Sequence, residues 1–202
     1  MKTLTNRSVA AAVAAFMLGC TAAANADNDR RNEDDFAARL SGYNEVHFAA
    51  GPPAALRGAI STGARGSFKA EIDDRKGVIY YELSFEGLES DVTQAHIHFG
   101  QRHTVGGIVV WLCQTAGTPA PAAVADLTPL CGGPRANTVT GSITPVQVLA
   151  QPLQGIAAEE FEELIRAIRA GATYANVHTV TFGPGEIRGQ LDDRKSGRGH
   201  HH

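Results

Sequence analysis

Two histidines separated by one residue are the clearest chemical feature of the sequence. His96 and His98 occur in the segment 94–100. Side chains alternate between the two faces of a β-strand, so the two imidazoles share one face while Ala95 and Ile97 take the other. The segment is therefore predicted to be a strand with its apolar face toward a core and its histidines on the outside. This spacing suits a metal site, although His-x-His also occurs in strands that bind nothing.

A third histidine has a similar setting near the C-terminal end. The alternation of residue types places His178 on the polar face of a second predicted strand, and Arg188 on the same face of the strand that follows. If the hairpin is symmetric about Gly183, His178 and Arg188 are direct cross-strand neighbours. A register shift of two residues would put Glu186 or Gln190 in that place.

Three histidines on strand faces predict a metal site. Neutral imidazole nitrogens are good ligands for copper and zinc, and three protein ligands leave a coordination position open. We therefore expect His96, His98 and His178 to converge on copper, with zinc as the alternative, although the third is far from the others in the sequence. His103 and His47 are further candidate ligands.

Most of the remaining chain is predicted to form strands. Apolar and β-branched runs alternate with glycine, proline and Asp-Asp turns, which favours an all-β fold, an antiparallel Greek-key sandwich or barrel. The predicted strands span residues 36–41, 65–72, 78–85, 93–99, 108–113, 138–144, 173–179 and 186–191. The exception is Ala157–Ala170, where apolar residues recur at helical spacing up to Gly171. This pattern predicts one short helix that plugs an end of the barrel.

The first residues of the chain indicate export. Residues 1–26 have the features of a secretory signal peptide: Lys2 and Arg7 at the start, a short apolar run, and a final Ala-Asn-Ala. The apolar run is too short to span a membrane, so no transmembrane segment is expected. The alternative is a lipoprotein signal in which Cys20 is lipidated. We expect a periplasmic or secreted protein, with an outer-membrane lipoprotein as the alternative.

The cysteine count and the charge agree with export. Once Cys20 is removed or lipidated, only Cys113 and Cys131 remain, and an oxidising compartment favours their pairing. The disulfide would tie the base of the loop 114–135 and add about 3 kcal/mol to stability. Without the signal peptide the formal net charge falls from −3 to −5, so a nucleic-acid partner is not expected.

The chain is expected to contain one folded domain with polar extensions on both sides. Residues 27–35 carry charges and asparagines and are predicted to be a disordered acidic tether. The β-domain is expected over residues 36–191, followed by a disordered tail over 192–202. The tail ends in three histidines, 200–202, which could themselves scavenge a metal.

Several motifs resemble those of the CHRD (chordin-domain) family. They are the segments 95–100, 107–110, 174–179 and 185–190, and the opening segment 40–46 is similar to the first motif of the family. The resemblance runs from Phe36 to Leu191 and implies a β-rich extracytoplasmic domain, without a defined activity. His47 stands where the family usually has proline, which adds a candidate ligand.

A more distant similarity is to the copper/zinc superoxide dismutases. These enzymes place a His-x-His on a strand of a Greek-key barrel, with a later strand histidine and an arginine that attracts the anionic substrate. The resemblance implies copper ligands at His96, His98 and His178 and an anion guide at Arg188. The zinc-site motif of that family has no counterpart in this sequence, so at most a copper-only variant is implied.

Three functions follow from these features. The leading hypothesis is an extracytoplasmic protein that binds copper, or zinc, through its strand histidines. The first alternative is a copper-dependent enzyme that resembles superoxide dismutase, with Arg188 drawing a small anion to the metal. The second alternative is a structural or adhesive β-module in which the histidines only hydrogen-bond to loops and no metal binds.

Overall fold

The computed structural model describes residues 33–49 and 55–194. The predicted signal peptide with Cys20, most of the predicted tether and the terminal histidines 200–202 lie outside the described residues. No helix in the described part is long and apolar enough to cross a membrane.

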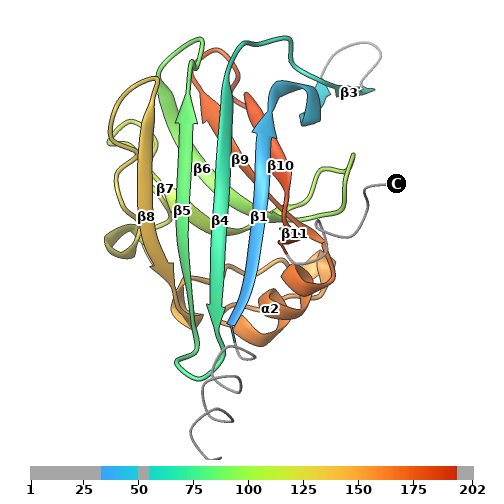
Figure 1. The fold of residues 1–202 in the computed structure, drawn as a ribbon, viewed down its shortest axis with the longest axis vertical. Helices are drawn as coiled ribbons and strands as arrows, with labels where there is room; N and C mark the ends of the chain where they lie inside the picture. The colour runs from blue at the N-terminus through green and yellow to red at the C-terminus, as the bar shows by residue number, and fades with distance from the viewer. Residues whose placement is uncertain (1–32, 50–54, 195–202) are drawn as a thin grey trace, which may run out of the picture. The chain divides into compact units, whose positions relative to one another are not determined.

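Antiparallel strands form a nearly closed barrel (Figure 1). Its strands are β1 (Glu33–Ser41), β4 (Arg65–Asp73), β5 (Val78–Glu86), β6 (Val92–Phe99), β7 (Gly107–Cys113), β8 (Asn137–Ile143), β9 (Thr173–Thr179) and β10 (Ile187–Gln190). They pair in the order β7-β6-β9-β10-β1-β4-β5-β8. The edge strands β7 and β8 lie against each other and almost close the ring.

The connections have Greek-key form. Strand β9 does not pair with β8, which precedes it among the barrel strands, but returns to pair with β6. Three consecutive strands with the fourth returning beside the first is the arrangement that defines a Greek key. The predicted all-β antiparallel fold is therefore confirmed, and this return connection is what brings the second histidine segment beside the first.

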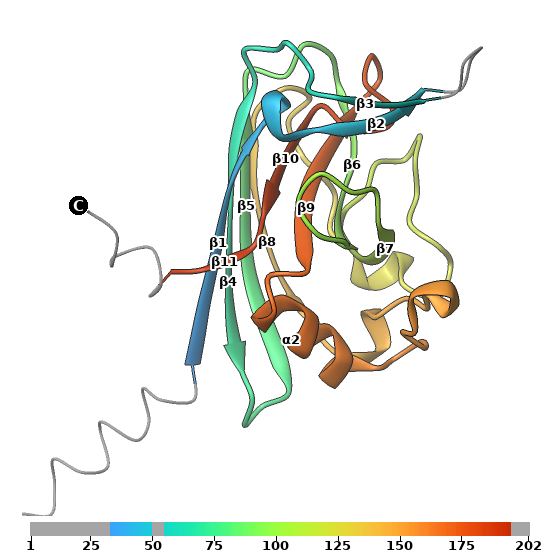
Figure 2. The same cartoon turned by 90° about the vertical axis from the view of Figure 1, so that its right-hand side faces the viewer.

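The inner faces of the strands enclose one hydrophobic core. Ala95, Ile97, Ala175 and Val177 point into it, as their alternation predicted. Helix α2 (Phe161–Arg169) lies across one end of the barrel and buries its apolar residues in the same core (Figure 2).

Helix α2 begins later than the sequence predicted. It starts at Phe161 instead of Ala157, because Glu159 has a φ of 66° and left-handed backbone cannot continue a right-handed helix. Gly171, with a φ of 64°, ends the helix as expected.

The sheet extends beyond both predicted boundaries of the β-domain. Strand β1 begins at Glu33, so the last three residues of the predicted tether pair with β4. The strand β11 (Asp192–Asp193) pairs with β1, so the first two residues of the predicted tail belong to the sheet. Backbone hydrogen bonds do not require apolar side chains, which is why acidic residues could extend these strands.

A two-stranded sheet was not predicted. It pairs β2 (Val46–Ala49) with β3 (Ala55–Gly58) and lies outside the barrel sheet. Strands of four residues are too short to show a clear alternation of residue types, so these two could not be predicted from residue pattern.

The predicted disulfide is present. Cys113, the last residue of β7, is bonded to Cys131, with a Cα–Cα distance of 4.9 Å. The side chain of Gln114 organises the loop that this bond closes, because its amide donates to the carbonyls of Ala125 and Thr128. The bond therefore ties a compact loop to the end of a barrel strand.

Candidate metal centre

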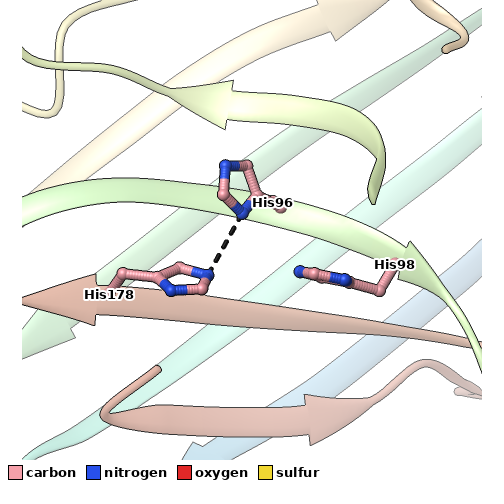
Figure 3. A group of neighbouring side chains, drawn as sticks. All are labelled: His96, His98 and His178. Carbon is pink, nitrogen blue, oxygen red and sulfur yellow. Dashed lines mark hydrogen bonds between the residues drawn. The ribbon is translucent and has the colours of Figure 1, made fainter. Parts of the chain in front are cut away.

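The three predicted strand histidines come together on the outer face of the barrel (Figure 3). His96 and His98 project from β6, and His178 projects from β9, the strand that pairs with β6. The centroid of the His178 ring lies 4.8 Å from that of His96 and 6.2 Å from that of His98. One nitrogen from each ring lies within 4.8 Å of the others, which is close enough for the group to hold a metal ion.

The histidine face is buried, which the sequence did not predict. His96 is completely buried, and only 7% of His98 and 5% of His178 are exposed. Trp111 of β7 packs edge-on against His96, with ring centroids 4.3 Å apart. Carbonyl groups of Gly106 and Gly183 contact the other two rings. The histidines lie on the outer face of the barrel as predicted, but Trp111 of β7 and the loops that follow β6 and β9 cover that face.

Backbone carbonyls fix the tautomers of two rings. The Nδ1–H of His98 donates to the carbonyl of Gly106 at 2.9 Å, and that of His178 donates to the carbonyl of Gly183 at 2.8 Å. The Nε2 atoms of both rings therefore carry lone pairs. Metal-ligating histidines characteristically donate their other ring nitrogen to a carbonyl or carboxylate in this way.

The third ring completes the group. His96 Nδ1 lies 3.1 Å from His178 Nε2, so in the metal-free protein it donates a proton to that lone pair. The buried Nε2 atoms of His96 and His98 have no hydrogen-bond partner. Metal–nitrogen bonds of about 2.0–2.1 Å separate two ligand nitrogens by about 3.3–3.6 Å. To surround an ion through His96 Nδ1, the metal-free group therefore needs small shifts of the rings and the move of one proton from His96 Nδ1 to Nε2 of the same ring.

Asn176 lies at the centre of the site, a role the sequence did not reveal. It is opposite His96 in the β6–β9 pairing, and its Oδ1 is 3.0 Å from His178 Nε2. Because His178 Nε2 carries a lone pair, two acceptors face each other. Such a contact is favourable with the amide turned so that its nitrogen donates to the ring.

Burial keeps the imidazoles neutral. It lowers the pKa of His98 to about 4 and that of His178 to about 4, and it holds the pKa of His96 well below the ordinary value. At neutral pH the three rings therefore present lone pairs without first losing a proton to solvent. This is the protonation state in which imidazole binds a metal.

Arg188 is close to the site but engaged elsewhere. It is only 2% exposed, and its Nη atoms donate to the carbonyls of Gln101 and Thr104 at 2.9 and 2.7 Å. Its guanidinium lies 3.3 Å from the centroid of the Tyr174 ring, which stacks on His98 from the neighbouring strand. Arg188 therefore holds the loop between β6 and β7 against the sheet.

The register of the last hairpin differs from the symmetric one. Arg188 pairs with Asn176 instead of His178. Gly185, with a φ of 133°, makes the turn asymmetric. The shift brings Glu186 level with His178, but its carboxylate accepts hydrogen bonds from the hydroxyls of Thr62 and Thr179.

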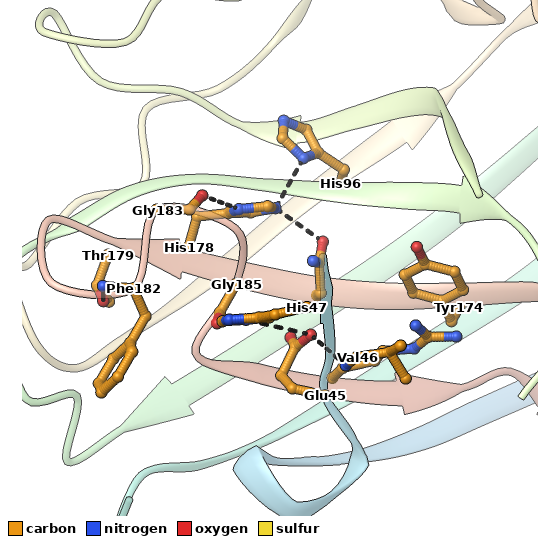
Figure 4. Close-up of polar contacts among 12 residues, drawn as sticks. Glu45, Val46, His47, His96, Tyr174, His178, Thr179, Phe182, Gly183 and Gly185 are labelled. Carbon is orange, nitrogen blue, oxygen red and sulfur yellow. Dashed lines mark hydrogen bonds and ion pairs between the residues drawn. The ribbon is translucent and has the colours of Figure 1, made fainter. Parts of the chain in front are cut away.

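Neither additional candidate ligand belongs to the three-histidine group. His47 of β2 lies nearby, but its Nε2 donates to the carbonyl of Gly185 at 2.6 Å (Figure 4). His103 is exposed in the loop between β6 and β7 and has a φ of 63°. Among the described residues, the group of histidine, cysteine and acidic side chains placed to hold a metal is His96, His98 and His178.

The comparison with protein families agrees with the motifs. The sequence model of the CHRD domain matches residues 36–191. The chain belongs to the CHRD domain family. No curated protein and no solved structure matches it. The histidine site of this CHRD domain must therefore be interpreted from its own geometry.

A buried acid completes the surroundings of the CHRD-domain site. Glu45, which precedes β2, is 3% exposed, and its Oε1 has no hydrogen-bond partner (Figure 4). Burial raises its pKa to about 8, against the opposing effects of Arg188 and of the hydrogen bond that the Val46 backbone N–H donates to Oε2. The sequence alone gave no indication of this residue. The site thus combines three neutral nitrogens with one acid and one guanidinium outside the ligand group.

Proposed function

We propose that this CHRD-domain protein binds copper through His96, His98 and His178 outside the cytoplasm, with zinc as the alternative metal. The observation that carries the proposal is the pair of tautomers fixed by Gly106 and Gly183. They turn two buried lone pairs toward one point, where the third ring also contributes a nitrogen. Imidazole nitrogens suit both copper and zinc.

A purely structural role would leave this arrangement unexplained. The Nε2 atoms of His96 and His98 are buried without a partner. A buried polar atom without a hydrogen bond costs about 1–3 kcal/mol. Apolar side chains at these buried positions would avoid that cost, so the histidines fit a site that binds an ion.

Binding is favoured over dismutase-like catalysis by the environment of Arg188. A residue that draws a small anion to a metal must expose its charge to solvent. Arg188 is buried, and two of its nitrogens bond to loop carbonyls. The location outside the cytoplasm is supported by the Cys113–Cys131 disulfide, because such bonds persist in oxidising compartments.

The test uses protein that ends at Gly199, so that the terminal histidines cannot scavenge metal. The purified protein is dialysed against copper or zinc, and its metal content is measured by mass spectrometry. We expect about one ion per chain, and none above background in a variant with His96, His98 and His178 all changed to Ala.

His103→Ala is the matched control, because this histidine is exposed and outside the group. It should keep full metal content. Wild-type protein that is folded by circular dichroism and retains neither metal would refute the proposal.

A further inference from the structure

We infer that the three-histidine site selects the monovalent ion Cu(I) over Cu(II) and Zn(II). The inference deepens the proposed function and rests on it. It follows from a juxtaposition of neutral ligands, a buried position and a neighbouring guanidinium.

The ligand group contributes no negative charge. It consists of three imidazoles, and no carboxylate or thiolate of the described residues belongs to it. A bound ion would therefore keep its whole charge inside the protein. All three ligands are less than a tenth exposed, so water screens this charge poorly.

The two charged groups nearest His98, Glu45 and Arg188, do not together compensate for that charge. The buried guanidinium of Arg188 stacks on Tyr174, and Tyr174 stacks on His98. The acid next to the site, Glu45, interacts electrostatically with Arg188. Even when ionised, Glu45 only offsets Arg188, so the pair supplies no net negative charge to a metal.

The cost of burying an ion rises with the square of its charge. Moving a divalent ion into a medium of low dielectric constant therefore costs about four times as much as moving a monovalent ion of the same size. Neutral ligands recover only part of that difference. The electrostatics therefore penalise Cu(II) and Zn(II) far more than Cu(I).

Coordination number acts in the same direction. Structural zinc takes four ligands and Cu(II) prefers a tetragonal set, whereas Cu(I), with a filled d shell, accepts three nitrogens in a plane. The site supplies three nitrogens. Trp111 packs on the His96 ring and limits the room beside it for a further ligand.

The experiment compares the three ions on the same protein, which again ends at Gly199. Cu(I) affinity is measured without oxygen by competition with bicinchoninate. Cu(II) and Zn(II) affinities are measured by competition with chelators of known strength. We expect Cu(I) to bind at least 100-fold more tightly than Cu(II), which raises the reduction potential of the bound copper by about 120 mV above that of the aqueous ion.

Asn176→Asp adds a negative charge beside the ligands with little change in shape. It should reduce the preference for Cu(I) over Cu(II) by at least tenfold, and lower the reduction potential by about 59 mV or more. The matched control is Asn44→Asp, the same chemical change at an exposed position. It should leave both the preference and the potential unchanged.

The outcomes separate the inference from the proposed function. Wild-type protein that binds Cu(II) or Zn(II) as tightly as Cu(I) overturns the inference and leaves the metal site standing. Protein that binds none of the three ions overturns both. If Asn176→Asp does not fold, the comparison of ions on the wild-type protein still decides the question.

Discussion

Lowering the pH from 7.5 to 5.5 should scarcely weaken metal binding. Protons compete with a metal for imidazole only near the pKa of the ring in the folded protein. Burial lowers that pKa to about 4 for His98 and His178, and holds that of His96 well below the ordinary value. At pH 5.5 fewer than about one ring in ten is protonated, so the affinity should fall by less than about twofold.

Ordinary histidines behave differently. With a pKa near 6.5, each ring loses about 11-fold in metal affinity at pH 5.5, and three rings together lose about 1000-fold. The assay is a chelator competition in which the chelator is calibrated at each pH, with a flexible three-histidine peptide as the control. A loss of 100-fold or more in the protein would show that its imidazoles are not desolvated as described.

Stability must be followed in the same pH range. The unfolded chain binds protons at its histidines near pH 6.5, whereas folded His98 and His178 stay neutral to about pH 4. The contribution of these two histidines to the free energy of unfolding of the metal-free protein is therefore complete above pH 6.5 and declines as the pH falls from 6.5 toward 4. Circular dichroism at pH 5.5 confirms that the affinity refers to folded protein.

Three further outcomes are expected. Copper should quench the fluorescence of Trp111, the single tryptophan, by more than half, because the indole ring contacts His96. The variant His96→Ala should abolish this response. Protein refolded after reduction of Cys113–Cys131 should lose about 3 kcal/mol of stability and melt about 6–12 °C lower, yet still bind metal; an unchanged melting temperature would count against the role of the disulfide. Burial raises the pKa of Glu45 to about 8, so stability should fall as the pH rises from 6.5 to 8, and Glu45→Gln should flatten this fall in urea unfolding.

The alternation of residue types was enough to predict the strands and the shared face of the histidines. His96 and His98 needed only the period of two, and His178 was placed by the same argument. The pairing of β6 with β9 then brought them together. Burial and packing make such periodic signals reliable, because a slip of one residue would expose the core face.

Other features of the site depend on contacts that a sequence does not show. The cover over the histidines comes from Trp111 and from the carbonyls of Gly106 and Gly183, which lie on three different segments. The register that pairs Arg188 with Asn176 depends on the backbone of the turn at Gly185. The burial of Glu45 depends on the β2–β3 sheet, whose strands are too short to predict. Each is set by tertiary structure and not by local pattern.

The long return connection from β8 to β9 has a consequence for when the ion can be acquired. His96 and His178 are 82 positions apart, and they meet only when β9 has been made and has paired with β6. An unfolded or partly folded chain therefore has no complete site, and occupancy would report that the barrel is assembled. An ion that binds only the folded state would therefore stabilise the pairing of β6 with β9. A free-ion concentration about 1000 times the dissociation constant would raise the free energy of unfolding by about 4 kcal/mol.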